Sequence, residues 1–500
     1  MNENYAQSGR ASHEFDVVVI GAGPVGENVA DYAHQGGLSA AIVESDLVGG
    51  ECSYWACIPS KALLRPVLAV DAARRVAGAR EVTGGPANAA AAFERRDRFV
   101  SGYDDAGQVE WVKSAGVTLV RGRGRLAGPR RVAVATEQGE LILSARVGVV
   151  VCTGSEAVLP PIEGLAQARP WTSREATSMR QAPGRIAVIG GGVVACEMAT
   201  AAAGLGADQV TMLVRDDRLL TSAEPFASAL VRDGLSEAGV QVRFGTNATK
   251  ARRAGDESGA SSGPVTLTLD GEEELVVDEV LVATGRRPRT SDLGLETIGL
   301  TPGNPLTTDD TLAVTFGEHE PAGEHPWLFA AGDVNGRAPL THHGKYQARL
   351  LGARLAAYAR AEGEAPSTSN RWGEFTPTAD TEALVQVIFT DPQVAMVGLT
   401  RAQALERGVP ARTIEFDLGA VSGAALHANG YTGRASMTVD VDREVLVGAT
   451  LVGQDVGEMI HAATIAVVGE IPLARLWHAV PAFPTMSEVW LRLLEEWRRG

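Results

Sequence analysis

The segment Phe15–Gly26 reads FDVVVIGAGPVG and predicts how the N-terminal part of the chain folds. Phe15–Ile20 is a short apolar run rich in valine, which is typical of a strand buried on both faces of a parallel sheet. It leads directly into a GxGxxG pattern made by Gly21, Gly23 and Gly26, and a helical stretch follows. Such glycines let the backbone close on a pyrophosphate at the helix N-terminus. We therefore expect a dinucleotide site here.

The next expected strand, Ser39–Val43, ends in an acid, Glu44. A carboxylate about 20 residues after a glycine turn can bind the 2′-hydroxyl of an adenosine ribose. GxGxxG alone is a weak signal that also occurs in plain tight turns. The full order of strand, turn, helix, strand and acid is much more specific for a nucleotide.

A cysteine-containing stretch follows at once: Gly49–Lys61 reads GGECSYWACIPSK. Positions five apart on a regular helix have Cα atoms roughly 8–9 Å from each other, and a disulfide tolerates at most about 7 Å. If Cys52 and Cys57 form a disulfide, the helix must therefore be distorted, which the flanking glycines and proline permit. The alternative is a pair of buried helical cysteines that never meet.

Size, charge and cysteine content narrow the class of protein. The 500 residues suffice for about three domains. A formal charge of −16 excludes nucleic acid as the expected partner, and no apolar run approaches the ~18 residues of a membrane span. Residues 1–14 are polar and predict a disordered tail, not a signal peptide. Four cysteines indicate a reducing cytoplasm, where a CxxxxC pair favours redox chemistry. We expect no metal site.

A second glycine turn lies in Ile186–Glu197, which reads IAVIGGGVVACE. Gly190 and Gly192 occupy the first two glycine positions, and Ala195 occupies the third. This again predicts a strand, a glycine turn and a helix that bind a dinucleotide. We expect Cys196, inside the helix, to be a packing residue, and Cys152, at the end of an earlier strand, likewise.

The strand after the second turn, Val210–Val214, ends in Arg215 instead of an acid, and Arg218 lies just beyond. An acid would bind a free ribose 2′-hydroxyl and repel a 2′-phosphate, whereas arginine does the reverse. The second site is therefore expected to prefer NADPH, with NADH the weaker choice. The alternative is a solvated surface arginine.

Two further features lie downstream. Leu328–Asp333 predicts a strand that ends in Gly-Asp before a helix starting near Thr341, which can place a carboxylate on a polyol chain. Residues 363–380 are polar and rich in Pro, Ser and Thr, and predict a linker. From residue 381 to 500 alternating strands are followed by helices, which indicates a separate α+β domain.

The two glycine turns, the CxxxxC pair between them and the Gly-Asp strand end occur together in one family. From about Phe15 to Trp497 the chain resembles the FAD-containing pyridine nucleotide-disulfide oxidoreductases, such as glutathione reductase, dihydrolipoamide dehydrogenase and mercuric reductase. The resemblance implies an α/β fold with two Rossmann-like domains and a C-terminal α+β dimerisation domain, in a homodimer. It places FAD in residues 15–165 and 286–362, NAD(P)H in 166–285, and dimerisation in 381–500.

The resemblance also implies roles for single residues. Glu44 would hold the FAD ribose, Gly124 would lie near the adenine, and Asp333 would bind the ribityl chain. Thr341 and His342 would sit at the pyrimidine edge of the flavin, where a helix N-terminus stabilises negative charge. The other residues expected to hold the cofactors are Gly21, Gly23, Gly26, Thr153, Gly154, Gly190, Gly192, Arg215, Arg218 and Gly285.

For the redox step, the resemblance implies that Cys57 faces the flavin and that Cys52 meets the substrate. Lys61 would approach the flavin N5 and pair with Glu197. Both residues of that pair are present, which supports intact electron transfer from NADPH to FAD.

One departure from the family matters. Family disulfide reductases end with His-Pro-Thr-x-Ser-Glu, whereas Phe483–Glu488 reads FPTMSE. Phe483 removes the general acid that protonates the leaving thiol, a loss that typically costs 10²–10⁴-fold. An apolar ring beside Cys52 should also raise the pKa of that thiol. His478 could replace the imidazole only by a different chain path.

Two branches of the family match only in part. The C-terminus lacks the cysteine pair of mercuric reductases. Phenylalanine also occurs at this place in the ketopropyl-coenzyme M carboxylase branch, but that branch has histidine where this chain has Glu488.

The leading hypothesis is an NADPH-dependent FAD flavoprotein that passes electrons to a Cys52–Cys57 disulfide and on to a non-standard small-molecule acceptor: oxygen, a quinone or an unusual sulfur compound. The alternative is a true NADPH-dependent reductase of a low-molecular-weight or protein disulfide. A third hypothesis is a non-catalytic, flavin-containing redox sensor, against which the retained cysteines and the Lys61–Glu197 pair weigh.

Overall fold

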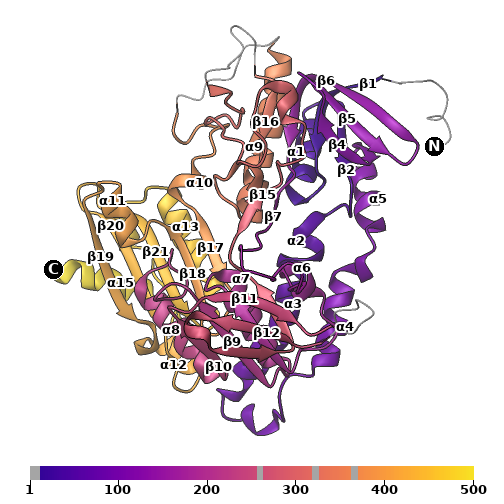
Figure 1. The fold of residues 1–500 in the computed structure, drawn as a ribbon. Helices are drawn as coiled ribbons and strands as arrows, with labels where there is room; N and C mark the ends of the chain where they lie inside the picture. Colours follow the sequence, from indigo (N-terminus) through magenta and orange to yellow (C-terminus); the bar gives the residue numbers. More distant parts are fainter. Residues whose placement is uncertain (1–11, 256–262, 318–325, 362–369) are drawn as a thin grey trace. The chain divides into compact units, whose positions relative to one another are not determined.

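The computed structural model describes residues 12–255, 263–317, 326–361 and 370–500 of the protein. They form two compact units, each assembled from three separate segments (Figure 1). The first unit joins Met1–Cys57, Val100–Glu156 and Arg286–Thr381. The second joins Ile58–Phe99, Ala157–Gly285 and Glu382–Gly500. The predicted α/β class is confirmed in both.

Seven of the described strands of the first unit form one sheet in the order β3-β2-β1-β6-β5-β4, with β16 paired to β6. Strands β1, β2, β3, β6 and β16 run parallel, and β5 and β4 are added antiparallel. The bounds are β1 Ser12–Ile20, β2 Ala40–Glu44, β3 Thr118–Arg121, β4 Arg123–Leu126, β5 Arg131–Thr136, β6 Gly139–Val151 and β16 Leu328–Ala330.

The central strand β1 is buried on both faces, as its valine run predicts. Val17 and Val19 pack in one apolar cluster with the helices α1 (Pro24–Gln35) and α9 (Thr341–Arg360), which lie side by side in Figure 1. Val18 packs in a second cluster on the opposite face. The remaining elements of this unit are α2 Gly50–Tyr54, α5 Ala106–Ser114, β7 Ser155–Ala157, β15 Arg286–Pro288 and α10 Ala379–Glu382.

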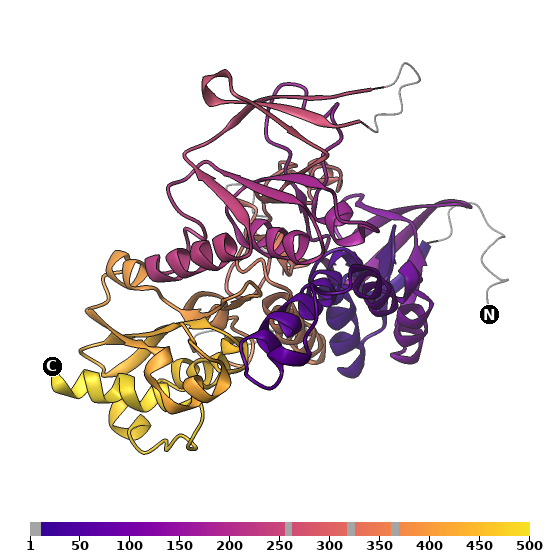
Figure 2. The same ribbon diagram turned by 90° about the horizontal axis from the view of Figure 1, so that it is seen from below.

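The second unit contains a four-stranded parallel sheet in the order β10-β9-β8-β14. One face packs against the helices α7 and α8, and the other against a three-stranded antiparallel sheet, β11-β12-β13 (Figure 2). The bounds are α6 Ser173–Ser178, β8 Arg185–Ile189, α7 Val193–Gly204, β9 Gln209–Val214, α8 Pro225–Glu237, β10 Val240–Phe244, β11 Ala248–Arg253, β12 Val265–Leu269, β13 Glu274–Val277 and β14 Glu279–Val282.

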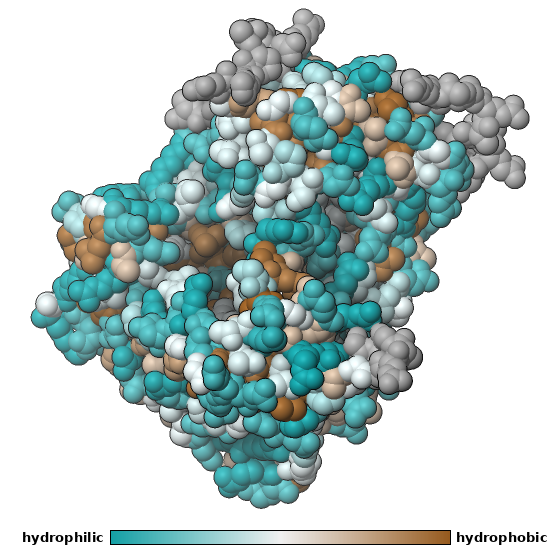
Figure 3. Space-filling model, viewed as in Figure 1, coloured by the Kyte–Doolittle hydropathy of each residue, from teal (hydrophilic) through white to brown (hydrophobic). Residues whose placement is uncertain are grey.

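The C-terminal part of this unit is a five-stranded antiparallel sheet in the order β17-β18-β21-β20-β19, with α13 packed on β21 and α15 on β19. Apolar side chains reach the surface over these elements, at the left of Figure 3. The bounds are β17 Val385–Ile388, β18 Gln393–Gly398, α11 Arg401–Glu406, β19 Ala411–Asp417, α12 Ser422–His427, β20 Arg434–Asp440, β21 Val445–Gly453, α13 Ile460–Val468, α14 Leu473–Leu476 and α15 Glu488–Arg499.

Two expected boundaries differ from the structure. The tail was expected to reach residue 14, but β1 already begins at Ser12, because residues 12–14 pair with residues 142–144 of β6; residues 1–11 lie outside the described ranges. The expected linker 363–380 contains packed residues in its described part, 370–380. Asp380 is buried there and accepts hydrogen bonds from α9, while residues 362–369 lie outside the described ranges.

The segment 58–99 also groups differently from the expectation, which assigned it to the FAD-binding part. It belongs to the second unit because α3 (Cys57–Arg74) packs its apolar face against α7: Leu63, Leu64 and Val67 share one core with Met198. Helix α4 (Ala89–Phe99) joins the same core through Phe93.

Within the described ranges, no helix is both long and apolar enough to cross a membrane.

Candidate active site

The first glycine turn has the geometry of a phosphate cradle. Gly21 has φ +101°, and a Cβ there would lie 2.5 Å from the carbonyl oxygen of Cys152. A Cβ at Gly26 would lie 1.9 Å from the carbonyl oxygen of Gly21, so both positions require glycine. Gly23, just before α1, has open space where its Cβ would be. These residues therefore fit a pyrophosphate on the helix N-terminus.

Glu44 is fixed at the end of β2 by backbone donors. Its carboxylate accepts hydrogen bonds from the N–H groups of Ala22, at 2.8 Å, and of Asp46, at 2.7 Å. Gly124 of β4 lies beside this strand end, since a Cβ there would be 3.1 Å from Val43 Cγ1. The predicted ribose and adenine residues are thus close together.

A second carboxylate, Glu27, was not predicted from the sequence. Burial raises the pKa of Glu27 to about 8, with a further contribution from the charge of Glu44, while Lys345 opposes the shift. Its Oε1 is buried and has no hydrogen-bond partner in the described part of the chain.

Asp333 lies just beyond the end of β16 and is held by its neighbours. Ser155 Oγ donates to the Asp333 carboxylate at 2.5 Å, and Arg286 Nε donates to Ser155 Oγ at 2.8 Å. Thr153 Oγ1 donates to the carbonyl of Arg289 at 2.8 Å. Because β1, β6 and β16 are parallel neighbours, their carboxyl ends bring the glycine turn, Thr153–Gly154 and Asp333 to one edge of the sheet.

The two cysteines lie on separate helices. Cys52 is in α2, which ends at Tyr54, and Cys57 begins α3. Trp55, with φ −136°, interrupts the helical path between them. This break supplies the helix distortion that a contact between the two cysteines requires. Gly49, just before α2, has φ +108°, a conformation that favours glycine.

The side chain of Cys52 hydrogen-bonds to Cys57, and both cysteines are thiols in this structure. Cys57 Sγ also lies 3.3 Å from Thr341 Oγ1, at the first residue of α9. The hydrogen bond to Cys57, followed by burial, raises the pKa of the Cys52 thiol. The hydrogen bond and the burial thus favour the neutral thiol of Cys52.

His342 is exposed next to Thr341, with its ring centroid 5.0 Å from that of His343. His343 is buried and lies 3.1 Å from Asp380.

In the second unit the predicted ion pair is present. Lys61 Nζ lies 2.7 Å from Glu197 Oε2. The other oxygen of Glu197 accepts a hydrogen bond from the N–H of Phe389 at 3.0 Å, and Lys61 lies 4.9 Å from the centre of the Phe389 ring. The buried carboxylate of Glu197 is thus satisfied on both oxygens. Cys196 is buried beside it, and burial raises its pKa to about 12, which fits a packing role.

The second glycine turn repeats the first closely. Gly190 has φ +129°, and a Cβ there would lie 2.4 Å from the carbonyl oxygen of Ala283. Gly192 has open space at the N-terminus of α7, and Ala195 is fully buried. Gly285, after β14, has φ +145°.

The two predicted arginines differ in what they contact. The side chain of Arg215 is 80% exposed and lies 3.3 Å from Asp216. Arg218 donates to the carbonyl oxygens of Thr221, at 2.6 Å, and Ala223, at 3.3 Å. Arg215 is therefore the better placed of the two to meet a ligand.

Near the C-terminus, Phe483 is 74% exposed. Glu488, which begins α15, is buried; its Oε1 accepts a hydrogen bond from Arg492 at 2.6 Å. Its Oε2 is buried with no hydrogen-bond partner among the described residues. His478 is exposed after α14. Glu488, the carboxylate of the family pattern, is thus present, and Arg492 in the next helical turn binds it.

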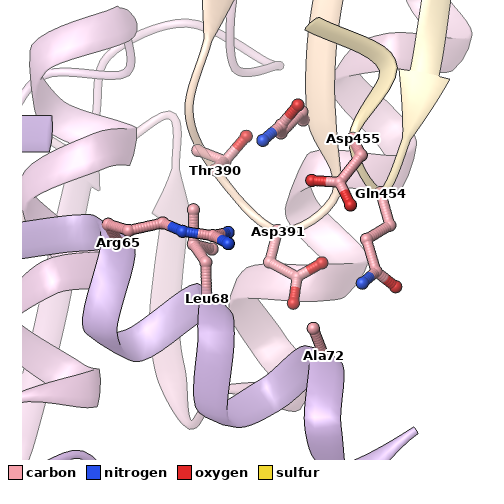
Figure 4. Close-up of a pocket in the computed structure, with 8 residues that line it drawn as sticks. Arg65, Leu68, Ala72, Thr390, Asp391, Gln454 and Asp455 are labelled. Atoms are coloured by element: carbon pink, nitrogen blue, oxygen red, sulfur yellow. The ribbon is translucent and has the colours of Figure 1, made fainter. Parts of the chain in front are cut away.

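A polar pocket in the second unit was not predicted from the sequence. Figure 4 shows Arg65 of α3 extending into it. Asp391, on the opposite wall, binds Arg75 at 2.7 Å, and Asp455 lies 3.0 Å from His427. The lining residues are Arg65, Leu68, Ala72, Thr390, Asp391, Gln393, Gln454 and Asp455. They come from three distant parts of the sequence, so no local pattern could have indicated the pocket.

No group of three or more His, Cys, Asp or Glu side chains in the described ranges is arranged to hold a metal ion.

Comparison with known proteins identifies the family of this chain. Residues 15–348 match the family described as pyridine nucleotide-disulphide oxidoreductase, and residues 384–493 match its dimerisation domain. The chain belongs to this family. It is accordingly a flavin-dependent oxidoreductase that uses FAD with NAD(P)H and carries a C-terminal dimerisation domain.

Relatives span nearly the whole chain. A mercuric reductase of Staphylococcus aureus is 29% identical over 480 residues, covering 95% of this chain and 81% of that protein. A dihydrolipoyl dehydrogenase of Thermus scotoductus is 31% identical over 482 residues, covering 95% of each. The solved structure of the HOCl-induced flavoprotein disulfide reductase RclA from Escherichia coli has a TM-score of 0.76 at 22% identity, covering 96% of this chain and 99% of that one. This last likeness shows the same fold.

Proposed function

We propose that the protein is an NADPH-dependent FAD flavoprotein in which the Cys52–Cys57 pair is redox-active and the terminal acceptor is not an ordinary disulfide. Oxygen, a quinone or an unusual sulfur compound would take its place. The observation that carries the proposal is Phe483, an exposed phenyl ring where the family has an imidazole, in a chain that retains the other residues of the relay.

Bound FAD would supply two-electron transfer between the nicotinamide and the disulfide. The chain's own residues would hold it: the first glycine turn at the pyrophosphate, Glu44 at the ribose and Asp333 at the ribityl chain. Thr341 would hold Cys57 through its hydroxyl group, 3.3 Å from the sulfur. Lys61 follows Cys57 by about one helical turn on α3, and Glu197 fixes its ammonium group.

The state of Cys52 argues against fast thiol–disulfide exchange. Only a thiolate attacks a disulfide, and the hydrogen bond to Cys57 and the burial raise the pKa of Cys52, which lowers its thiolate fraction. In the family an imidazole takes up and returns this proton, whereas the ring of Phe483 has no proton to exchange. An acceptor that does not form a mixed disulfide with Cys52 avoids this obstacle.

Arg215 supports NADPH as the donor. It stands where the first turn has an acid, and its exposed guanidinium can bind a 2′-phosphate through two N–H groups. We further propose a homodimer through residues 381–500, as the dimerisation-domain match supports, in the cytoplasm, as the low cysteine count suggests.

Steady-state assays test the proposal. With NADPH as donor, we expect slow turnover of oxidised glutathione, lipoamide and mycothiol disulfide, and faster turnover of a quinone or oxygen. Phe483→His should raise the disulfide rates by about 10–100-fold, because it restores a proton donor. Phe483→Leu is the matched control and should change them little. Rapid disulfide turnover by the unaltered protein would contradict the proposal.

The second candidate is a true disulfide reductase that obtains its proton elsewhere. Glu488 favours it, since this buried carboxyl keeps one oxygen without a partner. On this account the unaltered protein turns over disulfides at ordinary rates, Phe483→His changes little, and Glu488→Gln slows the reaction. A purely sensory protein is disfavoured by the intact Lys61–Glu197 pair; rapid anaerobic bleaching of its flavin by NADPH would eliminate that hypothesis.

A further inference from the structure

The helix that carries Cys52 is held by a carboxylate of its own, Glu51. Glu51 Oε1 accepts a hydrogen bond from Arg289 Nη2 at 2.8 Å, and its Oε2 lies 3.6 Å from Arg286 Nη2. The side chain of Glu51 is 21% exposed. Both arginines come from a segment more than 230 residues further along the chain, so the contact joins two distant parts of the first unit.

Arg286 and Arg289 are themselves held by hydrogen bonds to the segment that follows β6. Arg286 donates to Ser155 through Nε, at 2.8 Å to the hydroxyl, and through Nη2, at 2.7 Å to the carbonyl oxygen. The N–H of Arg289 donates to the carbonyl of Gly154 at 3.0 Å. Ser155 in turn binds Asp333. The arginines are therefore anchored at the sheet edge that carries the expected cofactor residues.

Helix α2 cannot hold its own position. It has only five residues, Gly50–Tyr54, which is far below the length at which an isolated helix is stable. Gly49 before it has φ +108°, and Trp55 leaves the helical path after it. On the apolar side, Tyr54 is buried in a small cluster with Trp55 and Val100. Glu51 provides a polar attachment of α2, one residue before Cys52.

We propose that Glu51, Arg286 and Arg289 are positioning residues for the redox pair: their ion pairs hold α2 so that Cys52 stays within bonding reach of Cys57. A disulfide forms more readily when its two sulfurs are held together, because less conformational freedom is lost on closure. This inference rests on the proposed redox role of the pair. Closure takes two electrons and two protons from the two thiols and joins the sulfurs.

Equilibration of the FAD-loaded protein with glutathione buffers tests the inference. Glutathione disulfide takes the two electrons and the two protons and becomes two molecules of reduced glutathione. Alkylation followed by mass spectrometry measures the fraction of protein with the Cys52–Cys57 disulfide. We expect Glu51→Gln and Arg289→Gln to lower the equilibrium constant for closure by about fivefold, equal to about 20 mV for a two-electron couple.

Arg287→Gln is the matched control. It removes the same charge from the same segment of the chain, but Arg287 pairs with Glu156 at 2.8 Å and not with Glu51 of α2. The equilibrium constant for disulfide closure in Arg287→Gln should equal that of the unaltered protein. Because Glu51 and Arg289 form one pair, the double variant should lose little more than either single variant. Arg289→Lys, which keeps the charge, should recover part of the loss.

The possible failures are distinguishable. Because exchange with glutathione is expected to be slow, equilibrium is approached from both the reduced and the oxidised protein; if the Cys52–Cys57 disulfide is absent at equilibrium in every buffer, the proposed function is wrong. If the unaltered protein closes the disulfide, and both Glu51→Gln and Arg289→Gln have the same equilibrium constant for closure, the positioning role is wrong. The proposed function is not affected by that result. An equal loss in Arg287→Gln would also contradict the positioning role. If Glu51→Gln does not fold, the two Arg289 variants decide the matter.

Discussion

The two glycine turns share a backbone and differ in charge. At Gly21 and at Gly190 a positive φ brings the chain so close to a neighbouring strand end that a Cβ would lie 2.5 and 2.4 Å from a carbonyl oxygen. The strand after the first turn ends in Glu44, and the strand after the second ends at Val214 and is followed by Arg215. We propose that this common backbone binds a pyrophosphate at each turn and that the side chain after the strand selects the ribose.

The two selecting side chains are also held differently. Glu44 accepts two backbone hydrogen bonds and so belongs to the rigid part of its turn. Arg215 is mostly exposed and lies beside Asp216, so a ligand must order it. The comparison suggests a fixed site for a cofactor that stays bound, and an adaptable site for a nucleotide that exchanges.

The largest effects are expected from the glycines themselves. Gly21→Ala should lower the flavin content more than about 100-fold, because a Cβ that overlaps a carbonyl at positive φ costs several kcal/mol. Gly190→Ala should keep the flavin and lose NADPH-dependent activity instead. Flavin absorbance and the KM for NADPH distinguish the two outcomes. Loss of flavin from Gly190→Ala would contradict the assignment of the two turns.

Reversing the charge at the second turn should have the next largest effect. Arg215→Asp should lower the preference for NADPH over NADH by about 10–100-fold, since a charged hydrogen bond to the 2′-phosphate becomes a repulsion. The measurement is the ratio of kcat/KM for the two nucleotides. Arg218→Gln is the control, because Arg218 already donates to two carbonyl oxygens, and it should have a much smaller effect.

Each glycine turn is followed by a helix that carries an acidic residue, Glu27 on α1 and Glu197 on α7, and the two side chains have different surroundings. Glu197 on α7 is paired with Lys61, and Glu197→Gln would remove the charge that fixes it. We expect flavin reduction by NADPH to slow by about tenfold, as for loss of a buried charged hydrogen bond. Stopped-flow absorbance under anaerobic conditions measures the rate. An unchanged rate would mean that the ion pair has no part in electron transfer.

The smallest effect concerns Glu27 on α1, whose pKa is raised from 4.5 to about 8. Because the folded protein disfavours the charged form, the contribution of Glu27 to stability falls as the pH rises from about 4.5 through 8. Glu27→Gln should therefore stabilise the protein by about 1–2 kcal/mol at pH 8.5 and have little effect at pH 4.

Urea unfolding at the two pH values measures this difference. Glu137→Gln, at an exposed position in the turn between β5 and β6, is the control and should show no such dependence on pH. Equal stability of Glu27→Gln and the unaltered protein at pH 8.5 would contradict the prediction.

Local sequence patterns predicted much of the fold and of the candidate site. The valine run, both glycine turns, Glu44 and Arg215 lie within short segments whose spacing carries the signal. The need for a break between Cys52 and Cys57 followed from helix geometry, and the structure places it at Trp55. The Lys61–Glu197 pair came from the family resemblance, since no local pattern joins positions 136 apart.

The features that could not be predicted from the sequence depend on contacts between distant parts of the chain. Asp380 was expected in a linker, yet it is buried because α9 supplies donors to it. Glu51 binds Arg289 across 238 positions. The grouping of residues 58–99 with the second unit follows from one apolar helix face, which composition alone does not assign to a partner.

The most direct test of the central claim is an anaerobic titration of the oxidised, FAD-containing protein with NADPH, followed by alkylation of the thiols that appear. We predict that the flavin absorbance changes and that Cys52 and Cys57 become alkylated in the unaltered protein, whereas Cys57→Ser yields no new thiol. Oxidation of NADPH without new thiols at these two cysteines, or a purified protein that binds no flavin, would contradict the account.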